Sequence, residues 1–400
     1  MSKFMPKGKA QNSKLKDLKV ALIVEELTQL GGAERVLDAF LEIFPQAPVY
    51  TLVWNRERTQ HHYDQLDIKP SFIQKMPLAT KRYKWYLPLM PWAVESFDLK
   101  NYSLVISITS ALAKGVKTTN RQIHICYCNT PTRWLWTDSA SYVRNAPIPF
   151  FIRPLMPAIL WWLRRWDLKV AKRPDFMIAN SKNVQKRIKK YYKRDSTVIY
   201  PMVETTKFKP AGNFENYYLL VSRIEPYKKV DLVIKAFKGL KENLKIVGSG
   251  TKKEQMQMKA TKNVEFLGRK SDEELAQLYA HAKAVIFPQE EDFGIVPIEA
   301  MAAGRPVIAY KKGGALETII PGKTGEFFFP QTIKALRSLI QRFGPEKYNP
   351  AIIRKQAQKF DKTLFKRVVL EYIIDKLKVK AQKVKEGATE GSQHGIKGVF

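Results

Sequence analysis

The chain has few of the residues that build disulfide frameworks or metal centres. Its 400 residues include two cysteines and five histidines, and the histidines have no metal-ligand spacing to Cys or Glu. The two cysteines, Cys126 and Cys128, alternate in an apolar run, so a strand would carry both on one face. Because two cysteines cannot form a disulfide framework, we expect buried, reduced thiols and a cytoplasmic protein.

Long apolar runs are also missing. No stretch reaches the roughly 18 uncharged apolar residues of a membrane-spanning helix, and the nearest, 148–163, is interrupted by Arg153 and three prolines. Six lysines precede Val20, but no apolar core of a signal peptide follows them. We therefore predict a disordered basic arm at residues 1–18 rather than a leader sequence.

Acidic residues are scarce. The 69 lysines and arginines outnumber the 37 acidic residues, which gives a net charge of +32. Such a charge indicates an anionic partner: nucleic acid, a membrane surface or a phosphorylated substrate. The sequence has no RNP-like motif, zinc-ligand spacing or helix-turn-helix pattern, so we expect no nucleic-acid partner.

Strand-like and helix-like runs alternate along the chain, which predicts an α/β fold with parallel sheets. The pattern restarts after an aperiodic linker at 201–213. We predict domains at 19–205 and 206–362, a last helix at 363–385 and a disordered tail at 386–400. The predicted strands are 20–24, 48–53, 104–108, 123–128, 176–179, 197–200, 217–221, 244–247, 264–267, 284–288 and 307–309. The predicted helices are 33–44, 182–192, 230–240, 272–281, 296–303, 315–320, 331–342, 350–360 and 364–380.

Glycines follow two of the predicted strands. Gly31 and Gly32 lie between the first strand and its helix, and Gly248 and Gly250 follow strand 244–247. Glycine there lets the backbone approach a ligand closely, although a simple tight turn is an equal explanation. Neither stretch is a GxGxxG motif, which argues against a dinucleotide fingerprint.

Two cations, Arg223 and Lys228, follow strand 217–221 in the stretch SRIEPYKK. At the carboxyl end of a strand they could clamp a diphosphate, Arg by its fork and Lys as a point charge. A solvated surface pair is the alternative interpretation.

The stretch 288–310 carries Glu291 and Glu299 around the turn Phe293-Gly294. The two glutamates could act as general acid and base, or they could hydrogen-bond hydroxyls of a sugar and a ribose. Glu299 lies within a predicted apolar helix, where a carboxylate is costly without partners. Glu290 and Asp292 flank Glu291 and could suggest a metal site. Because the chain has no Asp-x-Asp motif, a solvated acidic loop is the preferred interpretation.

Together these stretches resemble the retaining glycosyltransferases of family 4, and among them bacterial surface-polysaccharide mannosyltransferases. The matching pieces are GGAERV (31–36), YCNTPTRWLW (127–136), ANS (179–181), IYP (199–201), VSRIEPYKKVDLVIKAF (221–237), VGSG (247–250), FLGR (266–269) and EDFGIVPIEAMAAGRPVIA (291–309). The resemblance implies a GT-B fold: two Rossmann-like, doubly wound domains that face a cleft, and a last helix that crosses back. The first domain would bind the acceptor and the second the nucleotide-sugar.

The resemblance also implies a role for each matched residue. Arg223 and Lys228 would bind the donor diphosphate, and Glu291 would contact hydroxyls of the transferred sugar; these three are the expected catalytic residues. Glu299 would hold the donor ribose. The other expected substrate-binding residues are Gly31, Gly32, Asn129, Arg133, Gly248, Gly250, Gly268, Arg269, Phe293, Gly294, Ile295 and Val296. The leaving phosphate would accept the acceptor's proton, so no enzyme nucleophile, metal or cofactor is expected.

One position departs from the family. Asn129 stands where the family commonly has a histidine that faces the transferred sugar; an asparagine can hydrogen-bond but cannot titrate. The departure leaves open a purely hydrogen-bonding role, an altered choice of donor, or a catalytically weakened sugar-nucleotide binder. A nucleotide-sugar hydrolase or epimerase of the same fold is a further alternative, but it would need a catalytic acid or base near the sugar, and the absence of histidine at 129 argues against it. Our main prediction is a transferase that moves a hexose, with GDP-mannose as the first choice of donor.

Basic and aromatic residues are concentrated in two segments of the first domain. Residues 151–194 carry 13 Lys and Arg against two Asp, a difference of +11, and 75–92 mixes cations with Trp, Tyr and Leu. Such mixtures suit an anionic membrane surface. We therefore expect a peripheral protein on the inner face of the plasma membrane, with a glycan or polyprenyl-linked acceptor. A buried apolar helix with solvated lysines is the alternative.

Overall fold

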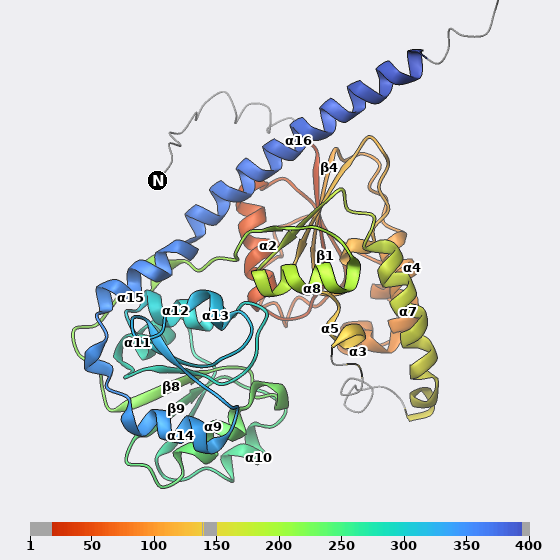
Figure 1. Ribbon diagram of the computed structural model, residues 1–400. Coiled ribbons are helices and arrows are strands. Elements are labelled where there is room, and N and C mark those ends of the chain that lie inside the picture. Colours follow the sequence, from red (N-terminus) through yellow and green to blue (C-terminus); the bar gives the residue numbers. More distant parts are fainter. Residues whose placement is uncertain (1–17, 138, 140–149, 394–400) are drawn as a thin grey trace, which may run out of the picture. The chain divides into compact units, whose positions relative to one another are not determined.

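The computed structural model describes residues 18–137, 139 and 150–393, and for 150–152 and 383–393 it describes the backbone only. Internal contacts divide the chain into two units (Figure 1). The first unit comprises Met1–Asn180, Val184–Ile199 and Lys366–Phe400, and the second comprises Ser181–Asn183 and Tyr200–Phe365. The division near Ile199 and Tyr200 comes earlier in the chain than the predicted boundary at 205/206.

The first unit is built on a sheet of seven described strands, in the order β3-β2-β1-β4-β5-β6-β7. Every neighbouring pair is parallel, and the order reverses between β1 and β4. All six residues of β5 are buried, as expected for a parallel strand covered on both faces. Cys126 and Cys128 are among them, and neither forms a disulfide. The strands are β1 (Val20–Leu27), β2 (Val49–Trp54), β3 (Ile68–Pro70), β4 (Leu104–Thr109), β5 (Ile123–Cys128), β6 (Phe176–Ala179) and β7 (Thr197–Val198).

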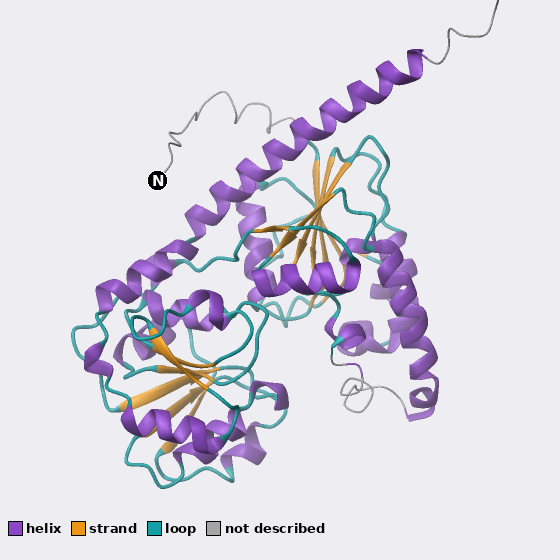
Figure 2. Cartoon of the chain, in the orientation of Figure 1, coloured by secondary structure: helices purple, strands orange, loops and turns teal. Residues whose placement is uncertain are grey.

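Helices flank these strands (Figure 2). In α7 the buried residues recur every three or four positions, including Leu160, Leu163 and Asp167, so the helix turns one stripe to the core. The same core includes Met90 and Val94 of α4. The helices are α2 (Gly32–Ile43), α3 (Ala79–Arg82), α4 (Met90–Glu95), α5 (Arg133–Trp136), α7 (Met156–Val170) and α8 (Lys182–Tyr192), with 3-10 helices η1 (Phe72–Lys75), η2 (Tyr83–Leu89), η3 (Ala113–Gly115) and η4 (Phe150–Leu155).

The second unit repeats this architecture with six described strands, in the order β10-β9-β8-β11-β12-β13, and again every pair is parallel. The order reverses between β8 and β11. The strands are β8 (Tyr217–Val221), β9 (Asn243–Val247), β10 (Val264–Gly268), β11 (Val285–Phe287), β12 (Val307–Tyr310) and β13 (Gly325–Phe328). Both units therefore have the parallel sheets that the sequence pattern predicted and the doubly wound, Rossmann-like topology that the family resemblance implied.

Three helices of the second unit begin with a side-chain cap. The Ser271 side chain accepts the Glu274 amide while the Glu274 carboxylate accepts the Ser271 amide, a capping box that starts α11. The helices are α9 (Val230–Phe237), α10 (Lys253–Gln257), α11 (Asp272–His281), α12 (Val296–Ala302), α13 (Ala315–Thr318), α14 (Ile333–Arg342) and α15 (Pro350–Ala357), with 3-10 helices η5 (Thr205–Lys207), η6 (Pro226–Lys228), η7 (Pro345–Lys347) and η8 (Gln358–Phe360). The last helix, α16 (Lys362–Gln393), begins in this unit and belongs to the first unit from Lys366 onward.

The last helix corrects one prediction. α16 continues to Gln393, so residues 386–393 of the predicted disordered tail are helical. Residues 394–400, and the predicted basic arm apart from Leu18, lie outside the described residues. Within the described part of the chain, no helix combines the length and apolar character needed to cross a bilayer.

Candidate functional site

The carboxyl ends of the second sheet gather most of the predicted site residues. The loops that follow β8 and β11 flank the point where the strand order reverses, and ligands of open parallel sheets bind at such a point. The first of these loops carries Arg223 and Lys228, and the second carries Glu291.

Arg223 and Lys228 both contact the side chain of Tyr227. Arg223 Nη2 donates a hydrogen bond to the Tyr227 hydroxyl at 2.6 Å, and Lys228 Nζ lies 5.2 Å from the centroid of the ring. Arg223 and Tyr227 are exposed, whereas the Lys228 side chain is largely buried. Tyr227 therefore contacts both cations of this loop, one through its hydroxyl and one through its ring, and two neighbouring cations suit a diphosphate.

Lys228 also joins the two loops at the switch point. Its ammonium group forms an ion pair with the Glu291 carboxylate, and the two side chains are 14% and 21% exposed. The loop after β12 supports this acidic stretch, because the Gly314 amide donates to the Glu291 carbonyl oxygen at 2.9 Å and Lys312 pairs with Glu290 at 2.9 Å. The predicted catalytic residues Lys228 and Glu291 are thus in direct contact.

The turn that follows Glu291 has a fixed conformation. Gly294 has a φ of +91°, and a Cβ there would lie 2.8 Å from the Phe287 ring, so the turn requires glycine. Phe293 is buried and stacks on Tyr200 with ring centroids 5.6 Å apart. Ile295 and Val296 then lead into α12. The predicted backbone contacts to the donor fall on this ordered entry to a helix.

Glu299 has the partner that its position in an apolar helix demands. It is 2% exposed within α12, and the Tyr279 hydroxyl of α11 donates to its Oε2 at 2.8 Å. A buried carboxylate without such a donor would be costly. The structure therefore shows a role for Glu299 in joining two helices, and ribose binding stays a prediction.

The glycines that follow β9 are required by packing between loops. A Cβ on Gly248 would lie 1.9 Å from the Ser222 carbonyl oxygen, and one on Gly250 would lie 2.3 Å from that of Ile224. The Gly248 amide donates to the Gly268 carbonyl oxygen at 2.7 Å. Arg269, which follows Gly268, donates from Nε to the Ser249 hydroxyl at 2.9 Å. These loops form one packed edge beside Arg223.

Four predicted residues belong to the first unit. Gly31 precedes α2 and Gly32 is its first residue, in the loop after β1. Asn129 follows β5 directly, and its amide donates to the Thr109 carbonyl oxygen at 2.8 Å. The Asn129 Nδ2 is buried and has no hydrogen-bond partner among the described residues. Arg133 begins α5.

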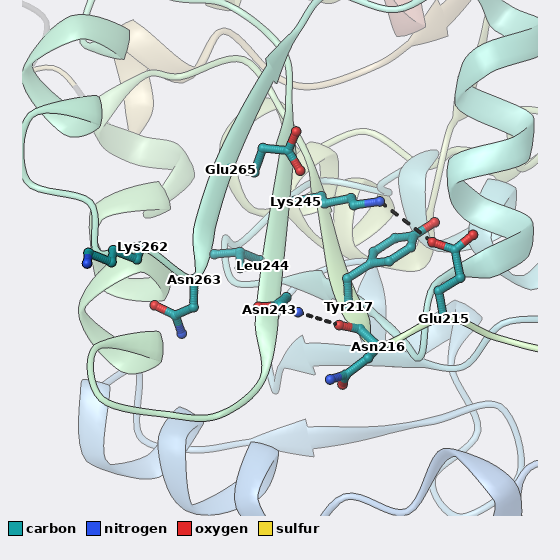
Figure 3. A pocket seen from close by; sticks show the side chains of 9 residues that line it. All are labelled: Glu215, Asn216, Tyr217, Asn243, Leu244, Lys245, Lys262, Asn263 and Glu265. Carbon is teal, nitrogen blue, oxygen red and sulfur yellow. Dashed lines mark hydrogen bonds and ion pairs between the residues drawn. The ribbon is translucent and has the colours of Figure 1, made fainter.

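One hollow in the second unit lies away from these residues (Figure 3). It is found at the amino ends of β8, β9 and β10, the edge opposite to the predicted site. Its lining holds the ion pair of Lys245 with Glu215 at 3.7 Å and a hydrogen bond from Asn243 to the Asn216 carbonyl oxygen at 3.1 Å. Because ligands bind at the carboxyl ends of parallel strands, we do not assign the donor to this hollow.

Three residues that the sequence interpretation did not include belong with the candidate site: Tyr227, Tyr279 and Gln289. The aromatic residue between two cations was the available signal for Tyr227. Gln289, two positions before Glu291, is 2% exposed and its Oε1 has no hydrogen-bond partner among the described residues. A ligand hydroxyl would satisfy such a buried acceptor.

No group of three or more potential metal ligands occurs among residues that the structure describes.

Comparison with known proteins agrees with this geometry. The family model of glycosyl transferases group 1 matches residues 202–360, which form most of the second unit. The α-1,3/1,6-mannosyltransferase ALG2 of Dictyostelium discoideum is 30% identical over 213 residues, which cover 40% of this chain and 50% of ALG2. The O-antigen chain mannosyltransferase RfbU of Salmonella typhimurium is 37% identical over 157 residues, which cover 36% of this chain and 44% of RfbU. The chain thus spans half or less of these curated relatives.

Solved structures extend the likeness to both units. HepE of Anabaena, in complex with UDP and glucose, superposes with a TM-score of 0.66 at 19% identity and covers 89% of this chain and 99% of HepE. A sucrose-phosphate synthase of Thermosynechococcus elongatus gives a TM-score of 0.69 at 19% identity, with 90% and 99% covered. At this identity the likeness concerns the fold. The two units thus share the GT-B fold of these structures, and residues 202–360 of the second unit match the model of glycosyl transferases group 1.

Proposed function

We propose that this protein is a retaining, metal-independent glycosyltransferase that moves a hexose from a nucleoside-diphosphate sugar to a lipid-linked or polysaccharide acceptor at the cytoplasmic face of a membrane. The observation that supports it most is the pair of cations, Arg223 and Lys228, held around Tyr227 at the switch point of the second sheet. A diphosphate is the ligand that two such cations suit.

In the reaction we propose, the bond between the sugar's anomeric carbon and the diphosphate oxygen breaks, and a bond to the acceptor oxygen forms on the same face. The acceptor's proton passes to the leaving phosphate. Arg223 and Lys228 stabilise the charge that develops on the diphosphate, which is an electrostatic contribution that needs no enzyme nucleophile. Glu291, beside Lys228, accepts hydrogen bonds from hydroxyls of the transferred sugar.

GDP-mannose is our first choice of donor. Two of the curated relatives, ALG2 and RfbU, are named mannosyltransferases, and the motifs around Gly31 and Asn129 resemble those of mannosyltransferases. HepE structures hold UDP or UDP-glucose, so uridine donors are the alternative to be tested beside it. The buried amide of Asn129 supplies a donor for a sugar hydroxyl, in place of the family's histidine.

The membrane part of the proposal is supported by exposed apolar side chains among cations in the first unit. Trp161 of α7 is 57% exposed, and the Arg165 guanidinium carbon lies 4.4 Å from its ring centroid. Trp92 of α4 is 58% exposed, and its ring centroid lies 6.1 Å from that of Trp162, so the two helices are neighbours. We define the basic-aromatic face as the exposed residues Phe72, Lys75, Leu78, Lys81, Arg82, Lys84, Trp92, Arg153, Leu155, Trp161 and Arg165.

The charge of this face has one sign. The segments that supply it, 72–94 and 153–166, contain no acidic residue. Cations near an anionic lipid surface contribute about 1 kcal/mol each, and exposed indole and leucine side chains enter the interface beside them. This is the chemistry of a peripheral protein whose acceptor is presented by a membrane.

The donor is tested by thermal unfolding of the purified protein with a panel of GDP- and UDP-sugars. A ligand present at about 100 times its Kd stabilises the native state by about 2.7 kcal/mol, so one donor should raise the melting temperature. Arg223→Ala should abolish this shift. Lys262→Ala is the matched control, because it removes one exposed cation from the opposite edge of the same sheet and should keep the shift.

Transfer is then measured with the stabilising donor, with and without EDTA. Equal rates in both are expected of metal-independent transfer, and loss of activity in EDTA would contradict it. The competing function, a nucleotide-sugar hydrolase, predicts release of free sugar at the same rate whether or not an acceptor is present. No stabilisation by any donor would contradict the proposed function.

A further inference from the structure

We propose that Asp167 of α7 and Lys114 of η3 are positioning residues that hold segment 129–136, which carries Asn129 and Arg133, in the geometry that transfer requires. The inference rests on the proposed function. The sequence motifs assign no role to either residue; both act through segment 129–136.

The pair is fully enclosed in the first unit. Lys114 Nζ lies 2.5 Å from Asp167 Oδ1, and the two side chains are 1% and 0% exposed. Charges are removed from water at a large cost, so a buried pair persists where its remaining donors and acceptors are also satisfied. The partners of this pair therefore show what it holds.

Both oxygens of the Asp167 carboxylate are directed at segment 129–136. The Thr132 hydroxyl lies 3.0 Å from Oδ1, and the Trp136 indole donates to Oδ2 at 2.7 Å. Thr132 is itself fully buried, and its amide donates to the Tyr192 hydroxyl at 3.3 Å. The segment is thus attached to α7 at both ends of α5, through Thr132 before its first residue and through Trp136, its last residue.

Lys114 connects the same point to the loop that follows β4. Its ammonium group donates to the Ala111 carbonyl oxygen, and the Thr132 hydroxyl lies 3.1 Å from that same oxygen. The hydroxyl has one hydrogen, so it donates to Ala111 or to Asp167 at a given moment. On its other side the Ala111 amide donates to Glu25 Oε1 at 2.9 Å, and Glu25 lies near the end of β1.

The network therefore joins the end of strand β1 to the loops that follow β4 and β5, at the carboxyl edge of the first sheet. An apolar pair of similar volume would often be as stable as a buried ion pair. Apolar contacts, however, have no direction, whereas the bonds to Thr132 and Trp136 fix the orientation of the turn between Asn129 and Arg133. This directional property is what a substrate-contacting segment needs.

The test compares Asp167→Asn with Glu95→Gln. Glu95 is the matched control, because Trp166, the neighbour of Asp167 on α7, donates to its Oε1 at 2.9 Å, and Arg173 does so at 2.8 Å. This second cluster binds the same helix but does not contact segment 129–136 in the described structure. We expect faster hydrogen exchange of the amides at 129–136 in Asp167→Asn, and wild-type exchange there in Glu95→Gln.

Kinetics supply the second readout. A displacement of about 1 Å at a substrate contact can cost about 100-fold in rate, so kcat/KM of Asp167→Asn should fall at least tenfold. Stabilisation of the protein by the free nucleoside diphosphate should stay at the wild-type value, because the nucleotide is held by the second unit. The Glu95→Gln variant should retain kcat/KM.

A double variant separates positioning from folding. Lys114→Met with Asp167→Leu removes both charges and leaves no unpaired charge in the core, whereas Asp167→Asn leaves the Lys114 charge buried without its carboxylate. The melting temperature of the double variant should therefore exceed that of Asp167→Asn. The double variant should still show fast hydrogen exchange at 129–136 and a low kcat/KM. Recovery of wild-type exchange and kcat/KM in the double variant would overturn the proposal, as would unchanged exchange in Asp167→Asn. If exchange at 129–136 responds as expected but the wild-type protein transfers no sugar, the proposed function fails and the positioning of the segment stands.

Discussion

Tyr227 contacts both cations of the candidate diphosphate clamp, and its hydroxyl and its ring do so separately. The hydroxyl accepts from Arg223 at 2.6 Å, whereas the ring faces Lys228 at 5.2 Å. Tyr227→Phe keeps the ring and removes the hydroxyl. A hydrogen bond to a charged group contributes about 1.5–3 kcal/mol, and part of this orients the Arg223 fork, so we expect roughly tenfold weaker donor binding by calorimetry.

The same substitution should leave the stability of the unliganded protein nearly unchanged, since Tyr227 is 47% exposed and exposed substitutions usually change stability by less than about 0.5 kcal/mol. Donor affinity equal to the wild-type value would show that Arg223 does not depend on Tyr227 for its orientation.

His124 is a residue for which the structure predicts a dependence of stability on pH. It is fully buried in β5 with Nε2 2.8 Å from the Ser107 hydroxyl, and burial lowers its pKa from 6.5 to about 3, with Asp175 opposing the shift. The folded state therefore disfavours the charged imidazole. His124 contributes stability above pH 6.5, and this contribution is lost as the pH falls from 6.5 towards 3.

At pH 5, about 1.5 units below the unfolded pKa, the loss corresponds to about 2 kcal/mol. The free energy of unfolding should therefore fall by about this amount more in the wild type than in His124→Asn between pH 7.5 and pH 5. Chemical denaturation at both pH values measures the difference. Equal pH dependence in the two proteins would mean that His124 is protonated without unfolding.

The place of a candidate site residue in the fold is more predictable from the sequence than the residue with which it pairs. Arg223, Lys228 and Glu291 were chosen from the sequence because strand ends and helix starts are local signals, and the structure places all three beside the same switch point. The ion pair of Lys228 with Glu291 and the bond of Tyr279 to Glu299 join residues far apart in sequence. No local pattern specifies such pairs; they follow from strand order.

At the scale of elements, the buried parallel strands and amphipathic helices were predicted well. β5, β6, β8, α8 and α11 have the predicted bounds, because continuous apolar runs and caps mark them. The missed strands and α-helices are short or flanked by proline: β3, β13, α3, α4, α5, α7 and α10. The sequence did not predict α7 because its exposed side also carries apolar residues. Trp161 is exposed there beside Arg165, so apolar and polar residues do not separate into the two faces that mark an amphipathic helix.

The exposed cations of the basic-aromatic face, on α7 and its neighbours, should contribute to binding of anionic membranes. Lys75→Gln with Lys81→Gln should weaken binding to vesicles that contain anionic lipid by about 2 kcal/mol, or roughly 30-fold, since each exposed cation near the surface contributes about 1 kcal/mol. Co-sedimentation with vesicles at moderate salt measures this. Raising the salt concentration should reduce the difference between variant and wild type.

Lys238→Gln with Lys241→Gln is the control, because it removes the same charge from exposed positions of the second unit. It should bind vesicles as the wild type does. Equal loss in both double variants would attribute the binding to net charge alone, and absence of any wild-type binding would contradict the proposed membrane surface.

At the scale of the whole molecule, the chain has two sheets with separate buried cores. The last helix begins in the second unit, but from Lys366 onward it belongs to the first. Val369 and Ile373 of α16 are fully buried, and Lys380 pairs with Asp175 at 2.7 Å. The carboxyl-terminal part of α16 is therefore a structural component of the first unit.

Two units with separate cores should respond separately in calorimetry. Ile373→Ala removes a fully buried side chain from the first unit, which costs about 2–5 kcal/mol and lowers a transition of this size by roughly 10 °C. A bound nucleoside diphosphate should instead raise the transition of the second unit, in the variant as in the wild type. A single transition that Ile373→Ala lowers and the nucleotide raises would contradict this prediction. It would show that the two units unfold cooperatively and that α16 stabilises both.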